Sequence, residues 1–288
     1  PRHDLFPRRG YRFPFSRGRA FTTLLTDHGC PYPCRFCVMG TLPYGRRPLS
    51  EVEEELDAIH SLGFSELFVL DQTFGLDAHR GRALAGLLGS RGFGWTAFTR
   101  PDTALAKGLL EAMAAGGCHT VILGIESASD AWLEAQQKGY TTAQTMQSVA
   151  AARAAGLRTV GTFLLGLPGD SRADAEACVD FAIRLGLDYF SANVAVPRAN
   201  TPFEREARAA GLFDASAPVI ADQAAQHAAL METGPLTAAG VLAAKRAAVR
   251  RFYGRPRWLA RRLAAAGSVR AVWAEAREGA ALLWRNTA

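Results

Sequence analysis

This sequence contains little cysteine and no long apolar run. Only five of its 288 residues are cysteine, and no stretch of about 18 consecutive apolar residues occurs, although 49% of the residues are hydrophobic. Because a membrane-spanning helix needs about 20 apolar residues, the sequence predicts no transmembrane segment. The low cysteine content and the lack of an apolar export segment at the amino end exclude a disulfide scaffold. They indicate a reducing compartment, so we expect a cytoplasmic protein.

The excess of positive charge is small and unevenly placed. The formal net charge is +6, and arginines crowd residues 2–19 and residues 250–262. Such clusters can bind nucleic acid or anionic lipid headgroups. No aromatic stacking platform accompanies them, so we interpret both clusters as solvated surface and expect no nucleic-acid partner.

Three of the five cysteines lie in one short segment, Cys30, Cys34 and Cys37 in the run GCPYPCRFC. Iron–sulfur clusters are held by thiolates, and a cluster of four irons needs four ligands unless one iron stays open. Three local thiolates therefore predict one open iron, which can bind and activate a small molecule as the vacant position of a catalytic metal does. We expect the three cysteines to hold a catalytic metal group.

Two other classes of protein fit part of this pattern. A zinc-stabilised binding protein could use the three cysteines with His28, Cys118 or Cys178 as the fourth ligand. Zinc sites usually present paired hooks, however, and only Cys34 and Cys37 form such a pair. A simple electron-transfer ferredoxin would use a fourth local cysteine, which the segment lacks. Metal analysis after anaerobic purification would separate the three classes.

Short apolar runs alternate with amphipathic segments through the middle of the chain. We expect strands at residues 21–26, 66–71, 95–99, 120–125, 159–165 and 189–196. We expect helices at residues 50–62, 77–88, 102–115, 142–155, 172–185 and 203–210. The first helix is expected to open with a capping box formed by Ser50 and Glu53. Such alternation predicts parallel strands joined by right-handed crossovers, so the fold class is α/β. Six strand–helix units make three quarters of an eight-fold barrel, and we expect a partial (β/α)6 TIM-like barrel.

Three regions are expected along the chain. A lead-in segment covers residues 1–20, the barrel covers residues 21–213, and a C-terminal helical region covers residues 214–288, with helices at 237–253, 257–265 and 268–284. The last helix is amphipathic and contains arginine, so a peripheral membrane contact is one interpretation. We favour the other, in which this helix closes the open side of the incomplete barrel.

Polar and glycine residues follow the expected strands where a barrel carries its chemistry, at the carboxyl ends. The cysteine segment follows the first strand directly. Asp71 follows the second strand, where it could hold a cation or cap a turn. Glu126 and Ser127 follow the fourth, and a carboxylate there could accept hydrogen bonds from ribose hydroxyls. Leu164 and Gly166 close the fifth, where a glycine lets the backbone approach a planar ligand.

These segments resemble the radical S-adenosylmethionine (SAM) superfamily. The cysteine spacing matches C-x3-C-x-(aromatic)-C, with Phe36 as the aromatic residue. Residues 70–74 resemble an Asp-Asp-x-Phe segment in which glutamine replaces the second acid. Residues 124–127 resemble G-x-E-S, and residues 162–169 resemble G-x-I-x-G-x-x-G with threonine at the first position.

The resemblance implies a radical SAM enzyme built on a partial barrel. In that family a [4Fe-4S] cluster, here on Cys30, Cys34 and Cys37, chelates SAM and cleaves it reductively. The resulting 5'-deoxyadenosyl radical abstracts hydrogen from an unactivated carbon, here of a small-molecule or lipid-like substrate. A reductant such as flavodoxin or ferredoxin is the implied partner.

The resemblance also implies roles for the residues at the strand ends. Phe36 belongs to the cofactor-binding segment, and Asp71 assists the SAM amino group. Glu126, with Ser127 beside it, binds the ribose. Leu164 and Gly166 frame the adenine.

The flanking segments at residues 4–14, 196–202 and 250–256 resemble the cobalamin-associated radical SAM enzymes. In those relatives a cobalamin-binding domain precedes the barrel, but this sequence has no D-x-H-x-x-G signature and Pro1 stands about where that domain would end. Two hypotheses follow. The enzyme works without bound cobalamin, or the chain is a fragment of a cobalamin-dependent C-methyltransferase.

Overall fold

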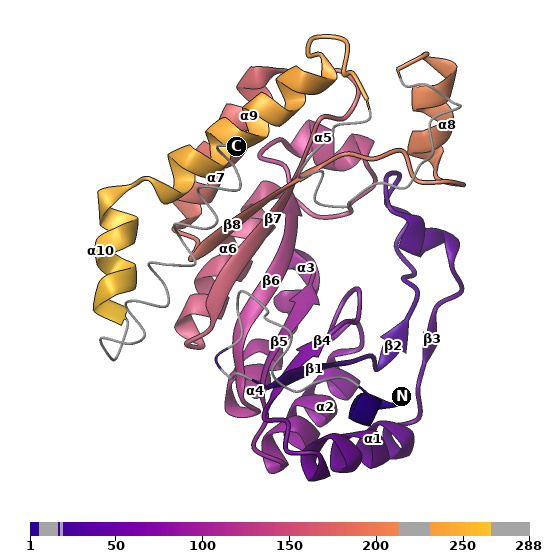
Figure 1. The fold of residues 1–288 in the computed structure, drawn as a ribbon, viewed down its shortest axis with the longest axis vertical. Coiled ribbons are helices and arrows are strands. Elements are labelled where there is room, and N and C mark those ends of the chain that lie inside the picture. Colours follow the sequence, from indigo (N-terminus) through magenta and orange to yellow (C-terminus); the bar gives the residue numbers. More distant parts are fainter. Residues whose placement is uncertain (6–16, 18–19, 213–230, 266–288) are drawn as a thin grey trace. The chain divides into compact units, whose positions relative to one another are not determined.

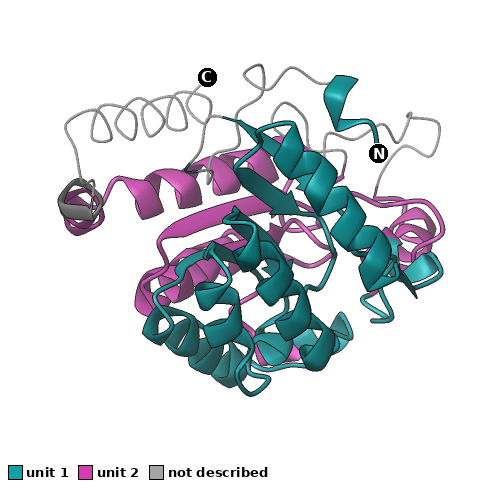
Figure 2. Ribbon diagram, turned by 90° about the horizontal axis from the view of Figure 1, so that it is seen from below, with its two compact units in different colours: residues 1–34, 39–125, 133–160 teal, residues 35–38, 126–132, 161–288 magenta. Residues whose placement is uncertain are grey.

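The computed structural model describes residues 1–5, 17, 20–212 and 231–265 (Figure 1). The chain divides into two compact units, drawn in different colours in Figure 2. Unit 1 contains residues 1–34, 39–125 and 133–160, and unit 2 contains the described parts of residues 35–38, 126–132 and 161–288. The cysteine segment therefore contributes residues to both units.

A six-stranded parallel sheet confirms the predicted α/β fold class. Its strands are β1 (Phe21–Leu24), β4 (Glu66–Val69), β5 (Gly94–Thr99), β6 (Cys118–Glu126), β7 (Arg158–Leu165) and β8 (Tyr189–Val194). Their order in the sheet follows their order in the chain, β1-β4-β5-β6-β7-β8. All six expected strands are present. Each strand is followed by at least one helix, as right-handed crossovers between parallel strands require.

The helices lie close to their expected positions. The longer ones are α1 (Leu49–Ser61), α2 (Ala78–Ser90), α6 (Thr142–Ala154), α7 (Arg172–Leu185), α8 (Pro202–Ala209), α9 (Ala238–Tyr253) and α10 (Pro256–Ala265). The capping box predicted for the first helix is wrong, because α1 begins one residue earlier after Pro48 and no side chain caps it. Capping boxes instead start α6 at Thr141 and α7 at Ser171.

The single helix predicted over residues 102–115 is broken in two. It forms α3 (Pro101–Ala104) and α4 (Leu109–Ala115). Gly108 lies between them with a φ of 72°, a left-handed conformation that glycine adopts without steric cost and that ends a right-handed helix.

Several short elements were not expected. They are a short hairpin of β2 (Asp27–His28) and β3 (Gly45–Arg46), the helix α5 (Asp130–Ala135) and two 3₁₀ turns, His3–Leu5 and Val38–Thr41. Each is only two to six residues long, so no sequence periodicity marks it.

Buried side chains on the strands of unit 1 form its core. Trp95 on β5 is fully buried, its ring lies 5.0 Å from that of Phe74, and its indole N–H donates to the Gly116 carbonyl over 2.7 Å. His119 is 4% exposed, and its Nε2 lies 2.5 Å from a carboxylate oxygen of Glu66. Glu66 begins β4 and His119 lies near the start of β6, so this buried pair sits at the amino ends of the strands, away from the end that carries chemistry in such folds.

Helix α9 covers β8, the last strand of the sheet (Figure 1). The Tyr253 hydroxyl donates to the Phe190 carbonyl over 2.8 Å and accepts from the Phe190 N–H over 3.0 Å. It thereby satisfies backbone groups that an edge strand would otherwise leave unpaired. Two of the three expected C-terminal helices are present as α9 and α10, and the third, at residues 268–284, lies outside the described residues. Among the helices that are described, none is both long and apolar enough to cross a bilayer.

Tyr253→Phe should lower the free energy of unfolding by about 1 to 3 kcal/mol, because it leaves the buried Phe190 N–H and C=O without their partner. Urea denaturation measures the change. Leu259→Ala on α10 is the control. Since Leu259 is 46% exposed, its loss should change the stability by about 0.5 kcal/mol or less. Equal effects of the two substitutions would contradict the role given to the hydroxyl.

Candidate functional site

The cysteine segment follows β1 and lies within the loop that the β2–β3 hairpin closes. Cys30, Cys34 and Cys37 form no disulfide, and each is partly exposed. Gly29 enters the segment with a φ of 68°, and a Cβ atom there would lie 2.3 Å from the Pro43 carbonyl oxygen. Only glycine therefore fits at the start of this segment.

The donor set fits an iron–sulfur cluster chemically. Three accessible thiols in residues 30–37 are the ligands such clusters use. Throughout the described ranges, however, no three cysteine, histidine or acidic side chains are arranged as a ready metal site. The sequence brings the three thiols together along the chain, and their convergence on one metal group stays a prediction.

The two remaining cysteines, named above as possible fourth ligands of a zinc site, are buried in the core. Cys118 is 5% exposed and Cys178 is 4% exposed. Burial raises the pKa of the Cys118 thiol to about 12 and that of the Cys178 thiol to about 11. Both thiols therefore stay protonated near neutral pH, and the thiolate is the form that binds metals. His28 is exposed on β2, and its ring packs against Gly45.

Asp71 follows β4 and is 2% exposed. Its carboxylate accepts hydrogen bonds from the Thr26 N–H (2.7 Å), the Thr26 hydroxyl (2.5 Å) and the Asp27 N–H (3.0 Å). Burial raises the pKa of Asp71, while these hydrogen bonds to the charged form oppose that rise. The carboxylate thus fixes the chain where it leaves β1 for the cysteine segment. Its predicted contact with the SAM amino group stays a prediction.

A second set of contacts fixes the same hairpin. Asp27 accepts from Arg80 Nε over 3.1 Å and from the Tyr44 hydroxyl over 2.8 Å. Arg80 Nη2 also donates to the Arg47 carbonyl over 2.6 Å. The local sequence does not mark Arg80 or Tyr44 as supports of this hairpin. Nothing in the spacing marks them, because their partners lie 17 to 53 residues away along the chain.

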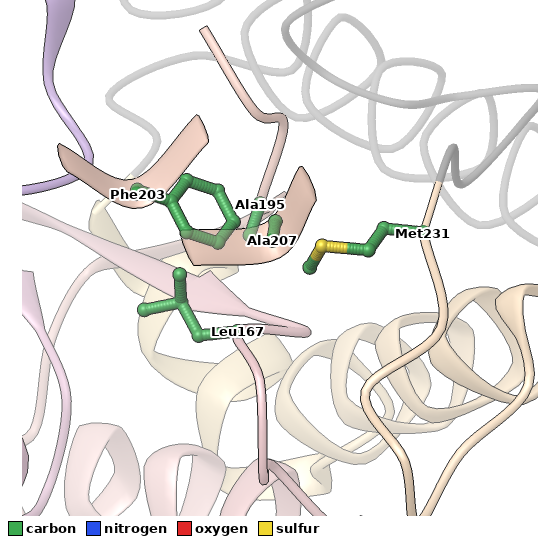
Figure 3. Close-up of a cluster of buried hydrophobic side chains, with 5 residues drawn as sticks. All are labelled: Leu167, Ala195, Phe203, Ala207 and Met231. Atoms are coloured by element: carbon green, nitrogen blue, oxygen red, sulfur yellow. The ribbon is translucent and has the colours of Figure 1, made fainter. Parts of the chain in front are cut away.

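In unit 2, Phe36 packs against an apolar cluster. Figure 3 shows the buried members of this cluster, which are Leu167, Ala195, Phe203, Ala207 and Met231. Three further side chains lie against the cluster with Phe36, namely Trp132, Leu164 and Leu212. The rings of Phe36 and Trp132 are 6.0 Å apart. The aromatic residue of the cysteine segment is therefore a packing anchor.

Helix α8 reinforces this anchor. The Phe203 N–H donates to the Arg35 carbonyl over 3.1 Å, and Arg35 forms an ion pair with Glu206. Both contacts hold the stretch that carries Phe36 and Cys37. Cys37 lies in this stretch, so these contacts also hold the backbone that carries its thiol.

A cavity of about 100 Å³ in unit 2 brings together predicted and unexpected residues. Ser127 and Leu164, both expected near SAM, line it together with Trp132, Asp170 and Cys178. Glu126 is half-buried and has a φ of 64°, a conformation rare for residues other than glycine and frequent at functional sites. Ser127 and Leu164 thus line the same cavity. Glu126, which precedes Ser127, has an unusual left-handed backbone conformation.

Asp170 shapes the turn after β7. Its carboxylate accepts from the Gly166 and Leu167 N–H groups, each over 2.9 Å, and burial raises its pKa to about 6. Gly166 has a φ of 87°, and a Cβ atom there would lie 2.7 Å from Val241 on α9. This close approach explains the glycine without a ligand, so the adenine contact of Gly166 stays a prediction.

Asp71→Ala should lower the free energy of unfolding by about 3 kcal/mol or more, because two buried donors and one partly buried donor would lose their acceptor. Asp71→Asn keeps an acceptor oxygen and should recover part of the loss. The control is Asp57→Ala on α1, whose 64% exposed carboxylate pairs with Arg91 and should contribute less than about 1 kcal/mol. A small effect of Asp71→Ala, comparable to the control, would show that the carboxylate does not fix this hairpin.

Comparison with known proteins gives a consistent picture. The sequence model of the radical SAM superfamily matches residues 25–182. An uncharacterized methyltransferase from Pyrococcus horikoshii is 36% identical over 208 residues, which are 70% of this chain and 44% of that protein. Cytidylyl-2-hydroxyethylphosphonate methyltransferase from Streptomyces wedmorensis is 28% identical over 224 residues, 73% of this chain and 41% of that protein. The chain thus spans less than half the length of these relatives.

A solved structure shares the fold. The radical S-adenosylmethionine methyltransferase TsrM from Kitasatospora setae, with cobalamin and a [4Fe-4S] cluster bound, superposes with a TM-score of 0.59 at 24% identity. The match covers 81% of this chain and 47% of that one. The segment that matches the superfamily's sequence model, residues 25–182, includes the three cysteines of the cysteine segment, Asp71, Glu126 and the turn after β7. This chain belongs to the radical SAM superfamily, whose members use a [4Fe-4S] cluster and S-adenosylmethionine.

Proposed function

We propose that this chain carries out the radical step of its superfamily on a small-molecule or lipid-like substrate, abstracting hydrogen from an unactivated carbon. The observation that carries the proposal is the cysteine triad within the segment that matches the family. When bound, the cluster and SAM together supply the one-electron chemistry that generates a 5'-deoxyadenosyl radical. Cys30, Cys34 and Cys37 would hold the cluster, and the protein's own task is to position the reactants and exclude water.

Contacts in both units fix the backbone of the cysteine segment, which serves that task. In unit 1 the Asp71 carboxylate fixes the backbone that leads into it. In unit 2 Phe36 is seated on the apolar cluster, and α8 binds the Arg35 carbonyl. Reactive groups held by packed side chains keep their geometry better than groups on loose loops. These contacts favour a cysteine segment whose backbone is anchored at Thr26 and Asp27 in unit 1 and at Arg35 in unit 2.

The SAM contacts are proposed on the family pattern. Glu126 binds the ribose hydroxyls with Ser127 beside it, Asp71 assists the amino group, and Leu164 with Gly166 frames the adenine. Ser127 and Leu164 share the walls of one cavity, which supports their assignment to one ligand. The left-handed backbone at Glu126 supports a functional role for that residue, because such strain persists where the surroundings require it.

Partners and location are proposed on the same basis. A reductant such as flavodoxin or ferredoxin would supply the electron, and the protein would work in the cytoplasm, where its thiols stay reduced. The lead-in at residues 1–20, the core at 21–213 and the helical region at 214–288 remain the proposed domain boundaries.

Methyl transfer is a second candidate reaction. The two sequence relatives described above are methyltransferases by name, and the structural neighbour TsrM is one with cobalamin bound. If the chain is part of a longer protein, a cobalamin domain upstream would make it a C-methyltransferase. If it acts alone, the hydrogen abstraction above starts a reaction of the substrate radical that involves no corrinoid-bound methyl group.

The cluster assignment predicts that anaerobically reconstituted protein holds about four irons and four sulfides per chain. Replacing Cys30, Cys34 and Cys37 together by alanine should abolish the iron, the broad visible absorption and the formation of 5'-deoxyadenosine under strong reductant. Cys118→Ala is the matched control and should keep all three. A triple variant that retains its iron would refute the assignment.

Glu126→Ala separates cofactor binding from cluster binding. Loss of a hydrogen bond to a charged group costs about 1.5 to 3 kcal/mol, so SAM affinity should fall about tenfold or more while the iron content stays unchanged. Calorimetry measures the affinity, and Glu111→Ala, a substitution on the exposed side of α4, serves as the control. Equal affinities in the two variants would remove Glu126 from the site.

An experiment with labelled SAM separates methyl transfer through a corrinoid from a reaction without cobalamin. SAM labelled in its methyl group, incubated with reductant and added methylcobalamin, should transfer no label through a corrinoid if this chain works without cobalamin. Equilibrium dialysis should then show no stoichiometric binding of cobalamin to these 288 residues. Tight stoichiometric binding would show that the barrel itself holds the corrinoid and would favour methyl transfer.

A further inference from the structure

Arg100 is a buried cation beside the cysteine segment. It follows β5 directly and is 5% exposed. Its guanidinium carbon lies 3.5 Å from the centroid of the Tyr32 ring, and its Nη1 points to the Cys34 sulfur at 3.9 Å. Two other donors, Nε and Nη2, bind the Asp102 carboxylate at 3.0 and 2.9 Å. All of these residues belong to unit 1.

The five donors of one guanidinium are therefore divided between three tasks. One edge pairs with Asp102, Nη2 also donates to the Lys138 carbonyl, and Nη1 is left for the thiol of Cys34. Lysine could not replace this arrangement, because only arginine is planar enough to stack on an aromatic ring and bind a carboxylate with the same group. The contacts with Tyr32 and Cys34 are thus specified by the rest of the network.

We infer that Arg100 is a positioning residue that raises the reduction potential of the cluster on Cys34. The inference rests on the proposed cluster site and goes beyond it, because it assigns control of the cluster's potential to one side chain of this chain. Tyr32 stands between Cys30 and Cys34 in the sequence, so the stacked guanidinium also fixes the spacer that separates these two ligands.

The sign follows from charge. Reduction adds one negative charge to the cluster, and a nearby cation or an N–H group directed at a ligand sulfur stabilises the more negative state. Hydrogen bonds to the sulfurs and the local charge are among the features that set the potentials of such clusters. Arg100 provides both through Nη1. A guanidinium stays protonated at any working pH, so the cation persists.

Other charged groups near Arg100 determine the net charge around Cys34. Asp102 is the nearest anion and offsets part of the positive charge. Lys138 is 6% exposed, and its ammonium lies 5.4 Å from the Tyr140 ring, which is itself 5.1 Å from the guanidinium carbon. Removal of Arg100 and removal of the Asp102 charge should therefore shift the potential in opposite directions.

The test is a potentiometric titration of the anaerobically reconstituted protein, with the reduced cluster followed by electron paramagnetic resonance. Arg100→Met should lower the ratio of reduced to oxidised cluster about tenfold at a fixed solution potential, because the cation and its N–H stabilise the reduced state more than the oxidised state. Tenfold corresponds to about 59 mV for one electron. Asp102→Asn should raise the ratio.

Two variants of Tyr32 separate the stack from the charge. Tyr32→Leu removes the ring that orients the guanidinium and should lower the ratio, whereas Tyr32→Phe keeps the ring and should leave it near the wild-type value. A residue that merely supports the loop would change iron retention in all variants and would not produce shifts of opposite sign.

The outcomes are distinct. Wild-type protein without a cluster would refute the proposed function itself. A loaded wild type whose potential is unchanged in both Arg100→Met and Asp102→Asn would overturn only the inference about Arg100. If Arg100→Met does not retain iron, Asp102→Asn and the two Tyr32 variants carry the test, and unchanged potentials in Asp102→Asn and Tyr32→Leu would overturn it.

Discussion

The buried carboxylate of Asp71 is the contact on which the cysteine segment depends. A carboxylate removed from water is costly unless hydrogen bonds compensate it, and here two backbone N–H groups and one hydroxyl do so. Because those donors belong to Thr26 and Asp27, the same contacts fix the chain where it leaves the sheet. Strand β1 itself is only four residues long, so the side chain supplies the rigidity that a short strand cannot.

Around this contact the chain supports its cysteines in two different ways. In unit 1 the supports are polar and charged, with Asp71, the Asp27–Arg80 pair and Arg100. In unit 2 the support is apolar, with Phe36 on the cluster shown in Figure 3. Apolar packing fixes position without adding charge, whereas a cation near a thiolate also changes its electronic environment. Substitutions in the apolar cluster should therefore change the position of the cysteine segment, whereas substitutions of the nearby charges should also change the reduction potential of the proposed cluster.

The sequence predicts a candidate site because the signals for it are local, and the structure supplies the surroundings of these residues. The cysteine spacing, the aromatic residue before the third cysteine and the acid after the second strand all lie within a few residues of each other or of a strand end. The broken helix at Gly108, the capping of α1 and the role of Trp132 could not be predicted in this way. The spacing of apolar residues does not show whether a glycine within it is left-handed. An aromatic residue on a short helix has no sequence pattern that distinguishes it from an ordinary surface or core residue.

The sequence by itself determined the fold class, the six strands, the cysteine segment and the family to which they belong, because strand–helix alternation and ligand spacing are properties of neighbouring residues. Only the tertiary structure decided which side chains surround those features. Arg100 reaches Cys34 across 66 residues of sequence, and Asp71 reaches Thr26 across 45. Contacts of that range arise from strand order and packing, which place the ends of β1, β4 and β5 next to one another. No local pattern encodes them.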